Sequence, residues 1–292
     1  MSTIEKALAK QNAVSNDKKK EIHKQEITSN ESATAEPEDK QELLAENTNK
    51  LIIDKDDMES RGFLIDTGTR KSIKDEFRQI KRKLLNNAFG AASKTLDNAN
   101  LIMVSSSKPN EGKTFTAINL ALSIALEQDK TVLLVDSDVL RPSITRELGV
   151  KQVPGLIEFL LDEKKHASEI IYHTNIDNLK IIPAGKPHHL SNELLASDKM
   201  ASLTKELSKR YPDRVVIFDC PPLLGLTETL VLANFMGQAI IVVEESKTQI
   251  EDVKKATQNL NENLAIGLVL NKATRSHKDM YGYYGYGYGS QA

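Results

Sequence analysis

The clearest chemical pattern in the sequence is a glycine-lysine-threonine triplet between an apolar run and a helical pattern. The run Leu101-Ile-Met-Val-Ser105 comes first, and the segment Ser107-Lys-Pro-Asn-Glu-Gly112-Lys113-Thr114 leads into the helical pattern. Such a loop places backbone N–H groups around phosphate oxygens at the N-terminus of a helix, where the helix dipole favours anions. Ser107 stands where the usual pattern has its first glycine. The segment therefore predicts a nucleotide-phosphate site.

The residue types within this loop predict separate roles. Lys113 supplies positive charge to the β- and γ-phosphates, and the Thr114 hydroxyl ligates Mg²⁺. Asn271 follows the last apolar run and is interpreted as an adenine contact, although an ordinary turn fits the same position. The residues expected to contact the nucleotide are Ser107, Pro109, Asn110, Glu111, Gly112, Lys113, Thr114, Phe115, Arg141 and Asn271.

Two further apolar runs end in aspartate. The first, Thr131 to Asp136, continues to Asp138, and the second, Arg214 to Asp219, continues into Cys220 and two prolines. Asp136 and Asp138 are one residue apart, so they leave a strand tip on the same side, at the sheet edge where ligands bind in α/β folds. A pair of helix caps is the alternative interpretation.

These carboxylates suit phosphoryl-transfer chemistry beside a magnesium-bound nucleotide. The residues predicted to be catalytic are Lys113, Asp136 and Asp138, with one of the two aspartates as the base. The residues predicted to hold the metal are Thr114, Asp136 and Asp219. Cys220 is interpreted as a small packing residue beside the proline pair, in preference to a reactive thiol.

The C-terminal segment is rich in tyrosine. Five of the seven tyrosines lie within eight residues, interleaved with glycine; they are Tyr281, Tyr283, Tyr284, Tyr286 and Tyr288. A self-associating low-complexity segment has such a composition. However, the cluster contains no Phe, Gln or Asn, and phenolic hydroxyls are what a phosphoryl-transfer enzyme needs as acceptors. We therefore predict that these tyrosines are phosphorylated.

Alternation of short apolar runs with helical patterns predicts the fold class. Five runs are predicted to be strands, at 101–105, 131–136, 214–219, 239–244 and 265–270, and helical patterns lie between them at 114–128, 227–235 and 250–263. Near-continuous Val, Ile and Leu in the runs favours a parallel sheet covered on both faces, and the whole is typical of a doubly wound α/β fold of the P-loop NTPase type. The predicted organisation is a mostly disordered polar arm at 1–71, a domain at 72–275 that begins with a helix at 72–87, and a Tyr/Gly-rich tail at 276–292.

Composition narrows the function classes. The chain has 292 residues and a net charge of -2, from 39 basic and 41 acidic residues, so no nucleic-acid partner is expected. A single cysteine excludes an intramolecular disulfide framework and suits a reducing compartment. No apolar run approaches the roughly 20 residues that span a bilayer, so we expect a soluble protein that reaches a membrane only through a partner.

Together these motifs resemble the bacterial tyrosine kinases that regulate capsule and exopolysaccharide assembly. The matching residues are Glu111-Gly-Lys-Thr114, the acidic strand end from Asp136 to Arg141, Asp219-Cys-Pro-Pro222 and the tyrosine cluster. The stretch from Glu76 to Ala88 looks most similar to the stand-alone kinases of exosortase-associated polysaccharide loci. The resemblance implies ATP and Mg²⁺ as cofactors and autophosphorylation of the tail. The linker of about ten residues before Tyr281 permits transfer within one chain or between subunits, and we predict transfer between subunits because a neighbour in a ring presents its tail at high effective concentration.

The resemblance also implies partners. The family builds rings through a helix with the pattern E-x-x-R-x-x-R, matched inexactly here by Asp75, Arg78 and Lys81; Glu76 and Arg82 offer another register. It further implies a membrane chain-length regulator as activator and a tyrosine phosphatase. The implied location is cytoplasmic, at the inner membrane through that regulator.

Two other functions fit parts of the sequence. Partitioning and cell-division-positioning ATPases carry a lysine at the position of Lys108 that reaches across a dimer. Here Pro109 and Asn110 follow that lysine instead of two glycines, so we interpret Lys108 as coincidental. A non-catalytic adaptor that associates through its aromatic tail is the third possibility.

Overall fold

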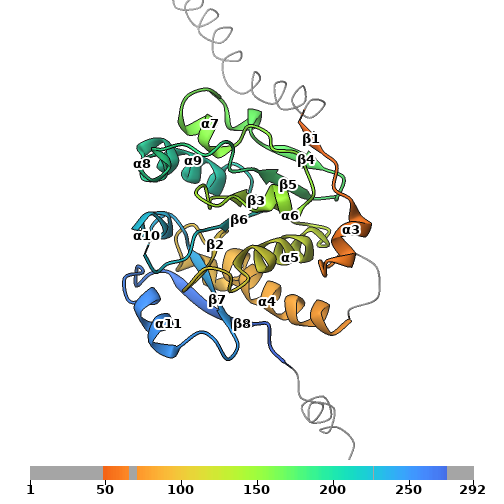
Figure 1. Ribbon diagram of the computed structural model, residues 1–292, viewed down its shortest axis with the longest axis vertical. Helices are drawn as coiled ribbons and strands as arrows, with labels where there is room; N and C mark the ends of the chain where they lie inside the picture. Colours follow the sequence, from red (N-terminus) through yellow and green to blue (C-terminus); the bar gives the residue numbers. More distant parts are fainter. Residues whose placement is uncertain (1–48, 66–70, 226, 275–292) are drawn as a thin grey trace, which may run out of the picture. The chain divides into compact units, whose positions relative to one another are not determined.

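The computed structural model describes residues 49–65, 71–225 and 227–274, which form one twisted sheet between two layers of helices (Figure 1). Within these residues the sheet has eight strands in the order β1-β4-β5-β3-β6-β2-β7-β8. All neighbouring strands are parallel except β4 and β5, which pair antiparallel. The strands are β1 (Lys50–Leu51), β2 (Leu101–Ser106), β3 (Thr131–Asp136), β4 (Tyr172–Thr174), β5 (Leu179–Ile182), β6 (Arg214–Asp219), β7 (Gln238–Glu244) and β8 (Ala265–Asn271).

The helices cover both faces of the sheet, as a doubly wound fold requires. On one face the buried side chains come from α3 (Lys55–Ser60), α4 (Lys71–Phe89), α5 (Lys113–Ala125) and α6 (Ile144–Glu147). On the other they come from α7 (Leu156–Leu160), α8 (Ser191–Leu195), α9 (Asp198–Lys209), α10 (Thr227–Ala233) and α11 (Ile250–Thr257). The predicted fold class is confirmed.

The central strands bring the predicted motifs to one edge. β2, β3 and β6 are buried along almost their whole length, which explains their continuous apolar sequence. In the β3–β6 pair Asp136 lies opposite Asp219, and β2 runs beside β6 before its chain enters the phosphate loop. The five strands predicted from the sequence are confirmed, while β1, β4 and β5 were not predicted.

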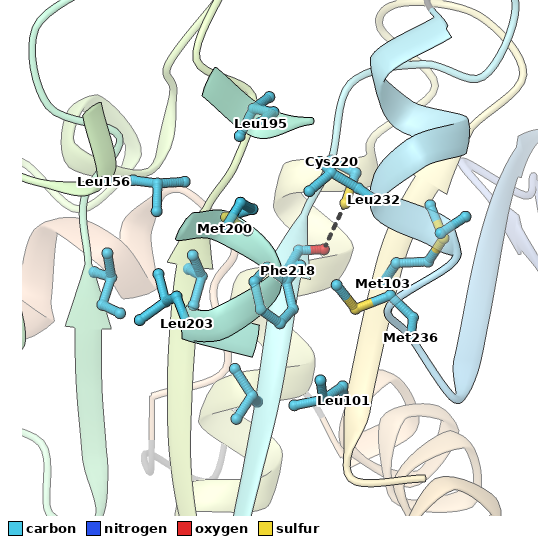
Figure 2. Close-up of a cluster of buried hydrophobic side chains, with 14 of the residues drawn as sticks. Leu101, Met103, Leu156, Leu195, Met200, Leu203, Phe218, Cys220, Leu232 and Met236 are labelled. Atoms are coloured by element: carbon cyan, nitrogen blue, oxygen red, sulfur yellow. Dashed lines mark hydrogen bonds between the residues drawn. The ribbon is translucent and has the colours of Figure 1, made fainter. Parts of the chain in front are cut away.

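Figure 2 shows the core on the face covered by α9 and α10, where Phe218 projects from β6 among Leu101, Met103 and Leu203. Cys220 follows in the same cluster and is fully buried, and its thiol lies 3.6 Å from the carbonyl oxygen of Phe218. Burial raises the pKa of this thiol to about 12. A thiol with such a pKa is not nucleophilic at neutral pH, so the packing interpretation is confirmed.

The predicted start of ordered structure near Ser72 is wrong, because residues 49–65 are also folded. β1 adds to the sheet edge beside β4, and α3 buries Met58 completely. Asp54 caps α3, because its side chain accepts hydrogen bonds from two backbone N–H groups of the first turn. The residues before this segment are strongly polar, and the segment was therefore predicted to belong to the same disordered arm. Its own signals are the apolar side chains flanking the acidic Asp54–Asp57 stretch and the cap itself.

The predicted helix at 72–87 is confirmed as α4, but one of its charges was misassigned. Lys81 is buried, and its ammonium donates to the Ser123 carbonyl at 3.0 Å and pairs with Glu127 at 2.5 Å. Ser123 lies in the last turn of α5, where carbonyl groups lack helical partners. Lys81 therefore caps α5 instead of facing outward with Arg78, which is exposed and paired with Asp75.

The predicted disordered arm up to residue 48 and the tyrosine-rich tail lie outside the described residues. The described part of the chain contains no helix that is long and apolar enough to cross a membrane.

Candidate nucleotide-binding and phosphoryl-transfer site

The loop between β2 and α5 has the backbone shape of an anion site. Gly112 precedes α5 with φ at 98°, a value that side-chain-bearing residues rarely adopt. A Cβ atom there would meet the Asn271 amide nitrogen at 2.0 Å. That amide donates to the Glu111 carbonyl at 2.9 Å, so Asn271 holds the loop backbone from β8. Its predicted adenine contact remains a prediction, while this contact was not foreseen.

A cavity of about 880 Å³ opens beside this loop, within the usual size range of ligand pockets. Its walls come from the loop, the segment after β3 and the segment after β6. Eight predicted site residues line it: Pro109, Asn110, Gly112, Lys113, Thr114, Phe115, Asp138 and Arg141. Ser107, Glu111, Asp136, Asp219 and Asn271 do not line it, and the first four of these are buried behind its wall.

Lys113 and Thr114 join the P-loop to both acidic strand ends. The Lys113 ammonium lies 2.7 Å from an Asp138 oxygen and 3.9 Å from Asp219. The Thr114 hydroxyl donates to Asp219 at 2.6 Å. The three sequence motifs, separated by as many as 105 residues, therefore meet within hydrogen-bonding distance.

Asp136 and Asp138 differ in position although both leave the same strand. Asp138 lines the cavity, whereas Asp136 is fully buried, and one of its oxygens accepts the N–H groups of Ser143 and Ile144 at 3.1 and 3.0 Å. Burial, with Asp219 next to it, raises the pKa of Asp136 to about 8. The helix-cap interpretation is thus correct in part, because Asp136 holds the first residues of α6.

The charged groups of this cluster shift one another's pKa values. Burial raises the pKa of Asp219 to about 6, although Lys113 and the Thr114 hydroxyl act against it. Burial alone would lower the pKa of Lys113, but the surrounding carboxylates outweigh it and the net shift is upward. The cluster holds three carboxyl groups and one ammonium. The raised pKa values of Asp136 and Asp219 mean that their charged forms are disfavoured here, so the cluster suits an added cation that would stabilise those forms.

Two orphaned oxygens support a divalent metal. One oxygen of Asp136 and one of Asp219 are buried with no hydrogen-bond partner among the described residues. In the described part of the chain, no three His, Cys, Asp or Glu side chains form an all-protein metal cage. Mg²⁺ needs none, since it binds one or two carboxylates together with nucleotide phosphates and water. Thr114 and Asp219 therefore fit the predicted magnesium site, and Asp136 lies opposite Asp219 on the neighbouring strand.

The structure adds residues that the sequence did not single out. Ser143 is nearly buried and its hydroxyl lies 2.9 Å from that of Thr114. Phe63 packs against Phe115 of the cavity wall with ring centres 5.2 Å apart. A serine directly before an apolar residue is a helix-start signal that could have indicated Ser143. Nothing in the sequence indicated Phe63.

Comparison with known proteins identifies the family. The family model described as an AAA domain matches residues 99–266, more than half of the chain. Tyrosine-protein kinase YwqD of Bacillus subtilis (strain 168) is 32% identical over 186 residues, which cover 63% of this chain and 77% of that protein. The chain belongs to the bacterial tyrosine-protein kinase family.

Two further relatives show how much of each protein the similarity covers. Tyrosine-protein kinase ptk of Acinetobacter johnsonii is 33% identical over 61% of this chain, but the match spans only 24% of that longer protein. The kinase domain of the Escherichia coli tyrosine kinase ETK superposes with a TM-score of 0.60 at 22% identity, over 82% of this chain and 94% of that domain. At that identity the superposition supports the fold.

Lys108, the residue that favoured a positioning ATPase, pairs within its own chain. Its ammonium lies 2.5 Å from Asp252 on α11, and about half of its side chain is exposed. Glu111 further shapes this part of the loop, because it accepts the Lys108 backbone N–H at 2.8 Å.

Proposed function

We propose that this kinase transfers the γ-phosphoryl group of ATP to the tyrosines of its own C-terminal tail. The observation that carries the proposal is the meeting of Lys113, Thr114, Asp138 and Asp219 beside one cavity. Mg-ATP bound here would supply the phosphoryl group, and its Mg²⁺ would supply the positive charge that offsets the carboxylates. Lys113 would exchange its contact with Asp138 for contacts with the phosphates, and Thr114 and Asp219 would hold the metal.

Asp138 is the better candidate for the base. It lines the cavity, while Asp136 is buried and occupied by the start of α6. Once Lys113 binds phosphate, Asp138 is free to accept the proton of an incoming tyrosine hydroxyl. Arg141 lies on the same wall and is exposed, so it can meet the nucleotide or the acceptor segment.

Transfer between subunits is the route we favour. β8 ends at Asn271, so about ten residues separate it from Tyr281 and span at most about 33 Å. Reach alone permits either route, but a tail entering its own site must turn sharply while aligning with the phosphate. A neighbour in an assembly presents its tail at high effective concentration.

Assembly would use the exposed side of α4. Lys81 is excluded from this surface by its burial, which leaves Asp75 and Arg78, with Glu76 and Arg82 exposed in the alternative register. Each tail phosphate adds about -1.5 to -2 charges at neutral pH, so phosphorylated tails repel and weaken the assembly. Light scattering should therefore find the unphosphorylated form larger; equal masses would contradict this.

The proposed cellular role is the one that the family resemblance implies. We propose that the kinase regulates polysaccharide polymerisation and export from the cytoplasmic side of the inner membrane. A membrane chain-length regulator activates it there, and a tyrosine phosphatase reverses the reaction. Co-purification of the kinase with a membrane chain-length regulator would support this placement.

Intact-mass analysis after incubation with Mg-ATP, followed by mapping of the phosphorylated residues, tests the reaction. A mixing experiment then tests the route. Lys113→Met chains, which keep their acceptors, are combined with active-site-intact chains whose five tail tyrosines are phenylalanine. Phosphate on the Lys113→Met chains establishes transfer between subunits. An unlabelled mixture of folded, co-assembled proteins would place transfer within one chain.

A further inference from the structure

Ser143 occupies the point where the three nucleotide motifs meet. It directly precedes α6, only 7% of the residue is exposed, and it contacts two of the motifs. Its backbone N–H donates to Asp136, and its hydroxyl lies 2.9 Å from the hydroxyl of Thr114. Thr114 in turn donates to Asp219, which belongs to the third motif.

The direction of the Ser143–Thr114 hydrogen bond follows from counting protons. A threonine hydroxyl has one hydrogen and two acceptor lone pairs. The Thr114 hydrogen points to the Asp219 carboxylate at 2.6 Å, which can only accept. Ser143 must therefore donate to Thr114. One lone pair of the Thr114 oxygen is then filled by Ser143, and the other faces the Lys113 ammonium at 3.5 Å. That second lone pair becomes available to a cation when Lys113 moves to the nucleotide phosphates, as the proposed function requires.

We propose that Ser143 is a positioning residue that orients the Thr114 hydroxyl for Mg²⁺. The metal ligand is Thr114; Ser143 acts on it from behind, as outer residues do in other metal sites. The Thr114 hydroxyl is held by Asp219 and by Ser143. Without the serine hydroxyl it loses the second of these contacts, and the direction of its remaining lone pair is less tightly fixed. The inference rests on the nucleotide site of the proposed function and does not depend on tyrosine being the acceptor.

The placement of Ser143 is itself fixed by α6. Asp136 accepts the N–H groups at the start of this short helix, and Arg61 donates to the carbonyl of Glu147 at its end, at 2.5 Å. Arg61 belongs to the segment before α4, which the sequence had assigned to a disordered arm. This segment therefore supports the metal site indirectly, because it holds the end of α6.

The test measures Mg²⁺ dependence of nucleotide binding in the full chain. A fluorescent ADP analogue is titrated with Mg²⁺ for the native protein, Ser143→Ala and Ser143→Thr. Ser143→Ala keeps the backbone N–H to Asp136 and removes only the hydroxyl. We expect it to raise the Mg²⁺ concentration for half-maximal effect about 10-fold, with Ser143→Thr restoring it. Binding of the analogue in EDTA should stay within about twofold, which also shows that the variant is folded.

The matched control is Ser123→Ala, which removes another nearly buried serine hydroxyl, on α5, the helix that begins with Lys113 and Thr114. It should leave the Mg²⁺ dependence unchanged. Equal Mg²⁺ dependence in native and Ser143→Ala proteins would overturn the inference. So would an equal loss of binding with and without Mg²⁺, or a Ser143→Thr variant as weak as Ser143→Ala. Phosphotyrosine is not read in this experiment, so a failure of the kinase proposal would be seen separately.

Discussion

Helix α4 and the sheet edge that carries the phosphate loop were both predicted from short charged motifs, but the sheet edge keeps more of its charges where the motifs suggested. Its exception is Asp136, which is buried under the start of α6. At the sheet edge Lys113, Asp138 and Asp219 converge as expected. On α4, Lys81 turns inward to cap α5 while Arg78 stays exposed. The difference lies in what fixes each side chain. Parallel strands deliver their ends to a common edge, whereas a helix surface offers several neighbours to one long side chain.

The largest effect should come from breaking the sheet-edge cluster. Lys113→Met removes the cation that meets the phosphates, and we expect autophosphorylation to fall about 10³-fold, equivalent to roughly 4 kcal/mol of transition-state stabilisation. Phosphotyrosine measured by intact mass checks this, with circular dichroism as the control for folding. Unchanged phosphorylation would remove the kinase assignment.

The next prediction concerns the segment that the sequence assigned to the arm. Met58 is fully buried, so Met58→Ala should lower the free energy of unfolding by about 2–5 kcal/mol. Ile52→Ala is the matched control, because Ile52 is 65% exposed and its loss should change little. Urea unfolding of both variants measures the difference. Equal stabilities would mean that α3 does not belong to the folded unit.

A third prediction separates the two charges of α4. Lys81→Met leaves the Ser123 carbonyl and Glu127 without their shared partner and should cost about 1–2 kcal/mol of stability. Arg78→Glu should leave stability within about 0.5 kcal/mol, since surface pairs contribute little, but should yield smaller assemblies. Thermal unfolding and light scattering measure the two effects. The reverse pattern would restore Lys81 to the assembly surface.

The smallest effect is expected at Lys108. Its partner Asp252 lies on its own chain and its side chain is half exposed, so Lys108→Ala should change autophosphorylation by less than about twofold. The rate of phosphotyrosine formation is the measurement. A collapse to the level of Lys113→Met would instead indicate a lysine that acts across a dimer, as in the positioning ATPases.

The sequence by itself determined the phosphate loop, the two acidic strand ends and the five strands that carry or flank them. It could do so because these features are local: a glycine at positive φ before a helix, and buried strands that end in aspartate. It also named eight of the residues that line the cavity. The tyrosine cluster, equally local as a pattern, lies outside the described residues and keeps its assignment as a prediction.

Only the tertiary structure decided which aspartate faces the cavity, where Lys81 points, and that residues 49–65 belong to the fold. Each depends on partners distant in sequence. Asp136 is covered by the start of α6, Lys81 meets the end of α5, and Met58 needs a core built by later segments. The Ser143–Thr114 contact is of the same kind, because 29 residues separate two hydroxyls that the strand order places 2.9 Å apart. Local patterns cannot encode such contacts, since the energy that fixes them appears only when the elements pack.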